Sequence, residues 1–557
     1  MVDSCSSEED SGIDELLARR SSWKSARFPT NTPTEAEAPM NLGSRTELGD
    51  RVSRQDIGVD GAPSSTQGHR VDPTGPPEKR QRFLGTTPAD SWVQHIREQI
   101  REPAARVGRQ LRPLMLCELC SGLCAATEAM KKVGIFQSET AMSVDPKEAA
   151  KKIGAVSSCQ SSHHFNTILD VMPGTPSPCH RHGRNCEVPW SSIDIVAIGA
   201  SCKPYSRQRV GRFSEPTSIV EHRDAKLLDQ FIGVLSTHRP RLALFENVLG
   251  IDENSIDSTQ EVTWLSHWLS KIAECGYIHR VLHLNARCWL PVIRQRVYVL
   301  IVRKDSGTED SLQQAANIVD KAITSASLDC PAPARDYFIK PGDPPWQAMQ
   351  QRWQAVEARV QGNPQKEDPS WQKQSQCLRA NLLAKGIQGY HLKPWTGVEA
   401  TSSTRGHDRG NIPCPRARGM GFTDRRRELL DLAFLHTCVK KGVNPSEAMH
   451  KQSVRAHVAT DLFCDISQNP YRRPWSTGAL RCFTTSTMTY SFERDSIIDP
   501  EEAFKLHGFD APPEGHGCSR DDLQDLVGNC MAVPCVAIAL LALVCTHASA
   551  LPCCFES

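Results

Sequence analysis

The chain has 557 residues, of which 39% are hydrophobic and 23% are charged, a composition that allows a sizeable core. Lys and Arg together number 65 against 64 Asp and Glu, so the formal net charge is +1. This balance excludes a globally basic nucleic-acid coat, and any nucleic-acid surface has to be local. The composition also excludes collagen, a coiled coil and a disulfide miniprotein.

Residues 1–105 are predicted to form a disordered tail, because Ser, Pro, Gly, Glu and Arg dominate and apolar periodicity is missing. Residues 1–14 lack the apolar core of a secretory signal, so we expect the 22 cysteines to be reduced thiols of an intracellular protein. The basic cluster from Lys79 to Arg82 indicates a nuclear location. A solvated linker is the alternative interpretation of that cluster.

Short apolar runs alternate with helical patterns in the next part of the chain. Strands are predicted at 114–119, 141–144, 194–199, 242–245 and 296–302, with helices at 125–134, 225–235 and 263–273. This alternation predicts an α/β fold with a doubly wound, mainly parallel sheet. Helical patterns return at 500–509 and 526–551. The last of these is almost uncharged, and we expect a buried core helix there rather than a membrane span.

Chemically useful side chains follow the predicted strands. Cys202 lies in a Gly/Ser/Pro-containing turn after the strand at 194–199, and Glu246 follows the strand at 242–245. Arg294 and Arg296 lie at the start of the last strand. Because strand ends of a doubly wound sheet meet at one edge, we expect a thiol, a carboxylate and two guanidiniums to converge. Cys202 is a candidate nucleophile, and a small core residue is the alternative.

The order of these segments resembles the cytosine-5 DNA methyltransferase family, of which the chain would be a divergent member. Members transfer a methyl group from S-adenosylmethionine to carbon 5 of cytosine. The matching segments are Gly199–Ser206 (similar to Gly-x-Pro-Cys-Gln-x-Phe-Ser), Glu246–Val248 (Glu-Asn-Val), Val292–Arg296 (Gln-x-Arg-x-Arg), Glu502–Phe509 (Glu-x-x-x-x-x-Gly-Phe) and Gly528–Asn529. Ser201, Lys203 and Val292 replace the Pro, Gln and Gln of those motifs.

The resemblance covers roughly 111–303 and 482–545 and implies a Rossmann-like methyltransferase fold with an inserted domain. The expected organisation is a tail at 1–105, a first catalytic part at 106–304, a target-recognition insert at 305–481 and a second catalytic part at 482–557. Within the insert, residues 404–427 hold seven arginines and two aspartates, which favours phosphate contacts. A solvated charged loop is the alternative.

The resemblance also implies the catalytic roles. Cys202 would add to carbon 6 of the ring, and Glu246 would bond N3 and the exocyclic amine. Arg296 would contact the base carbonyl, while Arg294 would support its loop. The cytosine would be flipped out of its duplex, and Ser206 with residues 207–212 would cover it. We also expect Lys203 to lower the pKa of Cys202.

The residues expected to hold S-adenosylmethionine are Leu119, Cys120, Ser121, Gly122, Leu123, Asp145, Asp170 and Asn529. Gly122 is the only glycine that remains of the family's Phe-x-Gly-x-Gly motif. Asp145 would bond the ribose hydroxyls, although the family usually has Glu at the position of Ser143. Asp170 would meet the adenine amine, and an exposed turn aspartate is the alternative.

A group of Cys and His residues lies between these motifs: Cys159, His163, His164, Cys179, His180, His182 and Cys186. Four zinc-type ligands could be drawn from them, but their spacings are irregular. We therefore interpret the segment as a polar surface insertion and predict no metal.

The sequence thus predicts a cytosine-5 methyltransferase acting on double-stranded DNA. The same chemistry on tRNA is one alternative, since the family has a branch that resembles a tRNA methyltransferase. A non-catalytic nucleic-acid-binding protein that kept the fold is another, which the loss of motif glycines favours. No membrane partner is expected, and the sequence names no protein partner.

Overall fold

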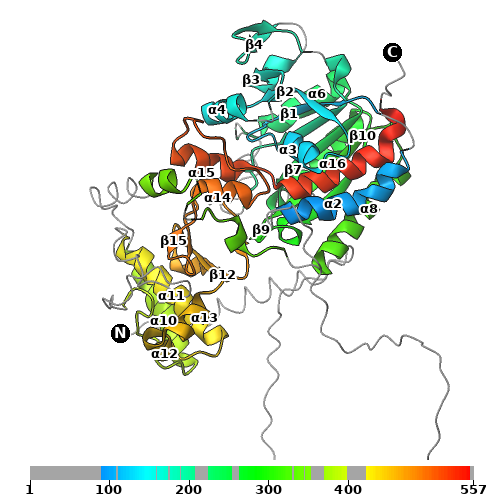
Figure 1. Cartoon of the computed structure of the whole chain (residues 1–557). Helices are drawn as coiled ribbons and strands as arrows, with labels where there is room; N and C mark the ends of the chain where they lie inside the picture. Colours follow the sequence, from blue (N-terminus) through cyan, green and yellow to red (C-terminus); the bar gives the residue numbers. More distant parts are fainter. Residues whose placement is uncertain are drawn as a thin grey trace, which may run out of the picture. The chain divides into compact units, whose positions relative to one another are not determined.

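The computed structural model describes most of the chain beyond residue 89 (Figure 1). The described residues are 90–107, 111–157, 160–172, 176–188, 190–206, 222, 224–253, 263–328, 331–340, 342–343, 345–352, 369–397 and 422–551. The basic cluster from Lys79 to Arg82 lies outside this part of the chain.

A seven-stranded sheet forms the centre of the larger core. In spatial order its strands are β3 (His163–Phe165), β2 (Ser138–Val144), β1 (Leu114–Leu119), β6 (Ile195–Gly199), β7 (Leu242–Val248), β10 (Gln295–Arg303) and β8 (Tyr277–Asn285). The neighbours from β3 to β7 are parallel, and β10 is antiparallel to both β7 and β8. The predicted doubly wound, mainly parallel sheet is confirmed. The strand order reverses between β1 and β6, the place where such sheets bind ligands.

Helices cover both faces of the sheet because alternate strand residues point in opposite directions. In β10, for example, Val299 packs into one core and Leu300 into the other. The helices α6 (Lys226–His238) and α7 (Trp264–Glu274) cover the face of Val299. The opposite face is covered by α2 (Ser91–Ala105), α3 (Ala125–Val133), α4 (Glu148–Val156), α8 (Glu309–Leu328), α14 (Pro500–Lys505), α15 (Arg520–Asn529) and α16 (Val533–His547).

The predicted end of the disordered tail at residue 105 is wrong for its last fifteen residues. Helix α2 places Trp92, Ile96 and Ile100 four residues apart on one face, and all three are buried. This face packs against α16 and α8 (Figure 1). The sequence pattern did not predict this helix, because its apolar stripe is narrow and lies among charged and polar residues.

The apolar C-terminal segment is a buried helix. By length and composition, Arg520–Ala550 would be long enough to cross a membrane, but 89% of its most apolar window is buried. Helix α16 packs against α2, α3 and α8 (Figure 1). It is apolar all round because helices surround it as well as the sheet.

The predicted insert at 305–481 contains residues of two different cores. Helix α8 packs against α16 and belongs to the core of the seven-stranded sheet. A separate core forms around Trp395, Phe434 and Tyr490, the last of which lies beyond residue 481. Its elements are α11 (Asp424–Lys440), α12 (Pro445–His450), α13 (Gln452–Ala459), β11 (Leu462–Asp465), β12 (Trp475–Thr477), β14 (Thr489–Ser491) and β15 (Ser496–Ile497). Helix α10 (Ser370–Ala384) packs against α11.

Two short strand pairs complete the described structure. The pair β9 (Val292–Ile293) and β13 (Leu480–Arg481) is parallel and joins the arginine segment to the end of the predicted insert. The pair β4 (Ser177–Cys179) and β5 (Arg184–Cys186) is an antiparallel hairpin.

Candidate active site

Three predicted catalytic residues converge at one edge of the sheet. Cys202 follows β6, Glu246 lies near the end of β7, and Arg296 lies on the adjacent strand β10. The register pairs Gly199 with Glu246 and Arg296 with Val248, so all three lie at the same level of the sheet.

Glu246, which is buried, and Arg296, which is half-buried, form an ion pair, with Arg296 Nε 3.2 Å from Glu246 Oε1. The contact lacks hydrogen-bond geometry, and Glu246 Oε1 is buried with no hydrogen-bond partner among the described residues. Burial raises the pKa of Glu246, and the nearby guanidiniums of Arg296 and Arg294 oppose this shift. The site therefore offers a carboxyl oxygen that is free to engage a polar ligand.

Cys202 is half-buried within reach of the same charges. Burial raises the pKa of its thiol, Arg296 and Arg294 lower it, and Glu246 and Cys482 add to the rise. Lys203 is exposed, so the cations that favour the thiolate are the two arginines. The thiolate support that we expected from Lys203 thus comes from residues distant in sequence.

Arg294 is buried, and its hydrogen bonds go to other segments rather than to Cys202 or Glu246. Its Nη1 donates to the sulfur of Cys482 at 3.2 Å and to the carbonyl of Phe483 at 3.3 Å. Its Nη2 donates to the carbonyl of Cys530. Arg294 therefore ties β10 to the segments that follow the predicted insert, and its role in catalysis stays a prediction.

The turn that carries Cys202 is held on several sides. Asn247 Nδ2 donates to the carbonyl of Ala200 at 3.2 Å, and Ser201 Oγ donates to Asp224 Oδ2 at 2.7 Å. Tyr205 is fully buried and accepts a hydrogen bond from Trp268 Nε1 at 3.1 Å. These contacts fix the position of the thiol before any substrate binds. The predicted covering loop at 207–212 lies outside the described residues.

Cys482 contacts both arginines, although no sequence motif pointed to it. Arg296 Nη2 lies 3.5 Å from its sulfur, which also accepts from Arg294. Burial alone would raise the pKa of Cys482, but the two arginines bring it below its ordinary value. Its position directly after the predicted insert is the only signal that could have pointed to it.

The predicted cofactor turn follows β1 and has a tightly constrained backbone. Cys120, Gly122 and Cys124 have φ values of 52°, 50° and 54°. Cys124 thus keeps the left-handed conformation that the family's second glycine would adopt easily. Glu118, which the sequence analysis overlooked, accepts hydrogen bonds from the backbone N–H groups of Ala126 and Thr127 and so anchors the start of α3.

This turn fits a polar ligand such as S-adenosylmethionine. Ser121 Oγ is buried and has no hydrogen-bond partner among the described residues, so it is available to a ligand. A Cβ added at Gly122 would meet nothing within 4 Å, which shows open space beside the backbone. Leu119 and Leu123 flank the turn with apolar surface.

The two predicted cofactor carboxylates are both engaged by the backbone. Asp145 Oδ2 accepts from the N–H of Gly122 at 2.9 Å, and Oδ1 accepts from that of Lys147 at 2.9 Å. Asp170 lies in the short helix η3 (Ile168–Val171), where its Oδ2 accepts from the N–H of Thr167 at 2.9 Å. A carboxylate oxygen can accept a second hydrogen bond, so both remain able to bind hydroxyl or amine groups.

The late Gly-Asn motif has a packing role. A Cβ at Gly528 would lie 2.2 Å from the backbone nitrogen of Thr485, so only glycine fits there. Asn529 is exposed, and its Nδ2 donates to the carbonyl and the carboxylate of Asp525. Asp525 in turn lies 2.6 Å from Lys147 Nζ, two residues beyond Asp145. Asn529 is thus linked to the predicted cofactor region indirectly, through Asp525 and Lys147.

Most of the arginine-rich segment at 404–427 lies outside the described residues. Arg425 and Arg427 are described at the start of α11, and both are half-buried. Arg425 donates to the carbonyl of Gln468. The phosphate-contacting role of this segment stays a prediction.

The doubly wound sheet is Rossmann-like, and it brings a cysteine, a glutamate and an arginine together at one edge. A model of the C-5 cytosine-specific DNA methylase family matches residues 114–544, well over half of the chain. The chain therefore belongs to this family, whose members use S-adenosylmethionine as methyl donor to carbon 5 of cytosine. No curated protein matches the sequence.

Several solved structures are similar over most of the chain. The Dnmt2 methyltransferase of S. pombe has 13% sequence identity and a TM-score of 0.37, covering 78% of this chain and 98% of its own. A Dnmt2 mutant of Spodoptera frugiperda has 12% identity and a TM-score of 0.35, covering 77% and 99%. A putative prophage DNA modification methyltransferase of E. coli has 14% identity and a TM-score of 0.35, covering 78% and 99%.

Proposed function

We propose that this chain methylates carbon 5 of cytosine in DNA, through a covalent adduct between Cys202 and a flipped base. The observation that carries the proposal is the convergence of Cys202, Glu246 and Arg296 at one level of the sheet, beside a polar turn with an unpaired hydroxyl. A site with these three groups supplies a nucleophile, a proton donor and a fixed positive charge.

Carbon 5 of cytosine is a poor nucleophile until the ring is activated. Addition of the Cys202 thiolate to carbon 6 forms a sulfur–carbon bond and moves the ring electrons toward carbon 5. Glu246 in its protonated form donates to N3 as negative charge develops there, and its raised pKa favours that form. S-adenosylmethionine supplies an electrophilic methyl group. Loss of the carbon 5 proton then expels the Cys202 thiolate.

Arg296 acts on both Cys202 and Glu246 in this mechanism. It lowers the pKa of Cys202, and it keeps a positive charge beside Glu246 and the position that the base carbonyl would occupy. Because the free thiol has a raised pKa, these charges reduce the cost of forming the thiolate. Arg294 holds the strand on which Arg296 lies.

The half-buried position of Cys202 favours a flipped base. A cytosine stacked in a duplex exposes only its edge in the groove, so its carbon 6 is out of reach of a thiol at a sheet edge. The base would leave the stack and enter the site. Ser206, which directly follows the nucleophile turn, would begin the segment that closes over it.

A second folded module favours DNA over RNA. The core around Trp395, Phe434 and Tyr490 has its own helices and a four-stranded sheet, and this suits a target-recognition module. The chemistry at Cys202 is the same for cytosine in tRNA, which is the second candidate. A nuclear location, based on the cluster from Lys79 to Arg82, belongs to the same proposal.

Trapping with 5-fluorocytosine tests the adduct. Fluorine at carbon 5 blocks the final elimination, so Cys202 would stay bonded to the base. We expect wild type with S-adenosylmethionine and a fluorinated DNA duplex to give a complex that survives denaturing electrophoresis. Cys202→Ala should give none, and Cys377→Ala, which changes an exposed cysteine, should behave as wild type.

The same experiment separates the candidates. A complex with fluorinated tRNA alone would contradict the DNA assignment and keep the catalytic roles. A complex that persists in Cys202→Ala would contradict the assigned nucleophile. If neither nucleic acid is trapped, S-adenosylmethionine binding measured by calorimetry distinguishes an inactive enzyme from a scaffold.

A further inference from the structure

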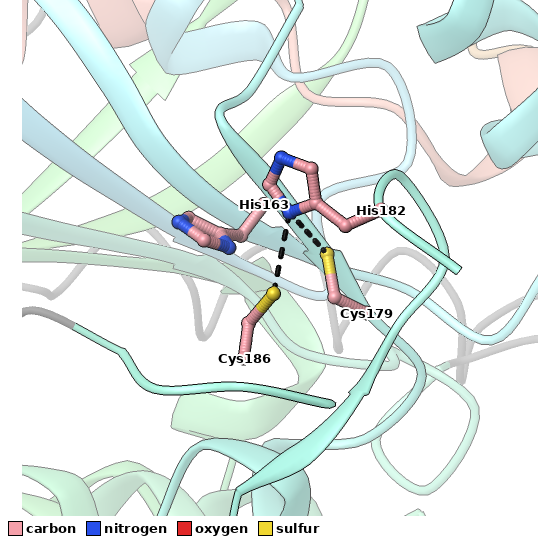
Figure 2. A group of neighbouring side chains, drawn as sticks. All are labelled: His163, Cys179, His182 and Cys186. Carbon is pink, nitrogen blue, oxygen red and sulfur yellow. Dashed lines mark hydrogen bonds between the residues drawn. The ribbon is translucent and has the colours of Figure 1, made fainter. Parts of the chain in front are cut away.

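Four metal-binding side chains lie together at the edge of the methyltransferase sheet (Figure 2). His163 belongs to β3, the edge strand, whereas Cys179, His182 and Cys186 belong to the β4–β5 hairpin and its turn. Their candidate ligand atoms all lie within 4.8 Å of one another. The irregular spacing in sequence concealed this grouping, because two separate elements supply the ligands.

Backbone hydrogen bonds position the two elements that carry these side chains. His163 pairs with Met142 of β2, which fixes the edge strand to the sheet. The N–H of His180 donates to the carbonyl of His164 at 2.9 Å and fastens the hairpin to β3. Gly183, with φ at 62°, closes the turn by donating to the carbonyl of Cys179 at 2.9 Å.

Two separations between candidate ligand atoms are close to those of a tetrahedral zinc shell. His182 Nδ1 lies 3.5 Å from the sulfur of Cys179 and 3.3 Å from that of Cys186. Zinc bonds of about 2.3 Å to sulfur and about 2.0–2.1 Å to nitrogen would set tetrahedral N···S separations near ~3.6 Å. Figure 2 shows His182 Nδ1 facing both sulfurs.

His163 is the fourth candidate ligand of this group. Its Nδ1 is buried and has no hydrogen-bond partner among the described residues. Its ring lies edge-on to that of His182, with 4.9 Å between centroids. A buried imidazole nitrogen without a partner, beside two free thiols, is explained when a metal completes the group.

We propose that His163, Cys179, His182 and Cys186 bind one Zn²⁺ in a closed Cys₂His₂ site. Mixed sulfur and imidazole ligands in a tetrahedral arrangement select zinc over the hard cations. Four protein ligands leave no open position, so the site is structural and takes no part in methyl transfer. Binding would release the thiol protons of Cys179 and Cys186 to solvent.

The metal would also hold the segment that carries Asp170 against the predicted cofactor region; this bracing effect, called the brace below, rests on the proposed function. The chain between His163 and Cys179 carries η3 with Asp170. Next to His163, the ring of His164 contacts Ser143 Oγ at 2.8 Å and the carbonyl of Asp145 at 3.0 Å. Pinning both ends of this segment would hold Asp170 and Asp145 in position.

Metal analysis of the untagged full chain tests the site directly. We expect about one zinc per chain in wild type, and less than a tenth of that in Cys186→Ser and in His182→Ala. Cys377→Ser should keep its zinc, since Cys377 is exposed on α10. His182→Cys should also keep it, because a thiolate can replace the imidazole. Cobalt exchanged into wild type should show sulfur-to-cobalt charge transfer and tetrahedral absorption bands.

Three results would overturn the proposal. One is a folded wild-type chain, prepared with zinc present, that holds none. Another is zinc that survives both Cys186→Ser and His182→Ala. The third is a disulfide between Cys179 and Cys186 in the peptide mass spectrum.

Calorimetry tests the brace separately. Zinc-free chain, prepared with a chelator, should bind S-adenosylmethionine several-fold more weakly than zinc-loaded chain. Equal affinities would refute the brace and leave the metal site standing. If zinc-loaded wild type binds no S-adenosylmethionine, the proposed function fails while the metal content still decides the site.

Discussion

Arg296 Nε lies 3.2 Å from Glu246 Oε1, across the antiparallel strands β10 and β7. Glu246 is buried and Arg296 is half-buried, and they act on the pKa of Cys202 in opposite directions. The strand pairing therefore couples the nucleophile, the acid and the cation in one electrostatic unit. A change in one member is expected to alter the other two, so single substitutions here will not be additive.

Replacement of Glu246 tests the acid role. Glu246→Gln removes the proton donor but keeps the size of the side chain, so kcat for methyl transfer should fall about 10²–10⁴-fold. Steady-state kinetics with tritiated S-adenosylmethionine measure this. Glu139→Gln, which changes an exposed glutamate on β2, is the matched control. A Glu246→Gln enzyme as fast as that control would contradict the role.

The thiol of Cys202 should become more reactive as pH rises. Its pKa is raised in the folded protein, so at neutral pH the thiol form dominates and alkaline pH increases the thiolate fraction. Arg296→Leu removes the largest opposing charge and should shift the alkylation profile to higher pH. Peptide mass spectrometry after pulsed iodoacetamide treatment isolates Cys202 from the other cysteines.

Lys203→Met is the control for this experiment. Lys203 is exposed, and the cations that act on Cys202 are the two arginines. We expect the Lys203→Met profile to match wild type. A shift as large as that of Arg296→Leu would restore the role that the sequence suggested for the lysine.

Ser121 should bind the cofactor through its unpaired hydroxyl. Ser121→Ala removes about 1–1.5 kcal/mol of hydrogen bonding, or roughly a tenfold loss in S-adenosylmethionine affinity. Isothermal calorimetry measures the loss. Ser236→Ala, which changes an exposed serine in the last turn of α6, should leave the affinity unchanged. Equal affinities for the two variants would place the cofactor elsewhere.

Gly528 should tolerate no side chain. Its Cβ would lie 2.2 Å from the backbone of Thr485, so Gly528→Ala should destabilise the protein by about 1–3 kcal/mol. Gly154→Ala is the matched change, because Gly154 is also helical and has nothing within 4 Å of an added Cβ. That variant should be stabilised by about 0.5–1 kcal/mol. Thermal unfolding that orders the two variants the other way would contradict the packing.

The sequence predicted the sheet and its edge well for a physical reason. Buried parallel strands are continuous apolar runs, and their ends meet at one edge whatever the loops do. Cys202 and Glu246 could therefore be grouped from their positions at the ends of parallel strands. Arg296 joins them because β10 runs antiparallel to β7, so the start of β10 lies at the same edge. The roles assigned to them remain predictions.

Residues whose positions depend on distant packing escaped the sequence analysis. The apolar face of helix α2 is buried because α8 and α16, which come more than 200 and 400 residues later in the chain, cover it. Cys482 reaches Arg294 and Arg296 because β13 pairs with β9 across the whole insert. The Cys and His group forms only where β3 packs against the β4–β5 hairpin. Local sequence patterns do not encode such contacts between separate elements.

The most direct test of the central claim is product mass spectrometry with deuterated-methyl S-adenosylmethionine. Wild type and Cys202→Ala would each be incubated with duplex DNA and, separately, with total tRNA. The account predicts labelled 5-methylcytosine in DNA with wild type and none with Cys202→Ala. Label in tRNA alone would contradict the DNA substrate. Label in DNA that persists in Cys202→Ala would contradict the covalent mechanism.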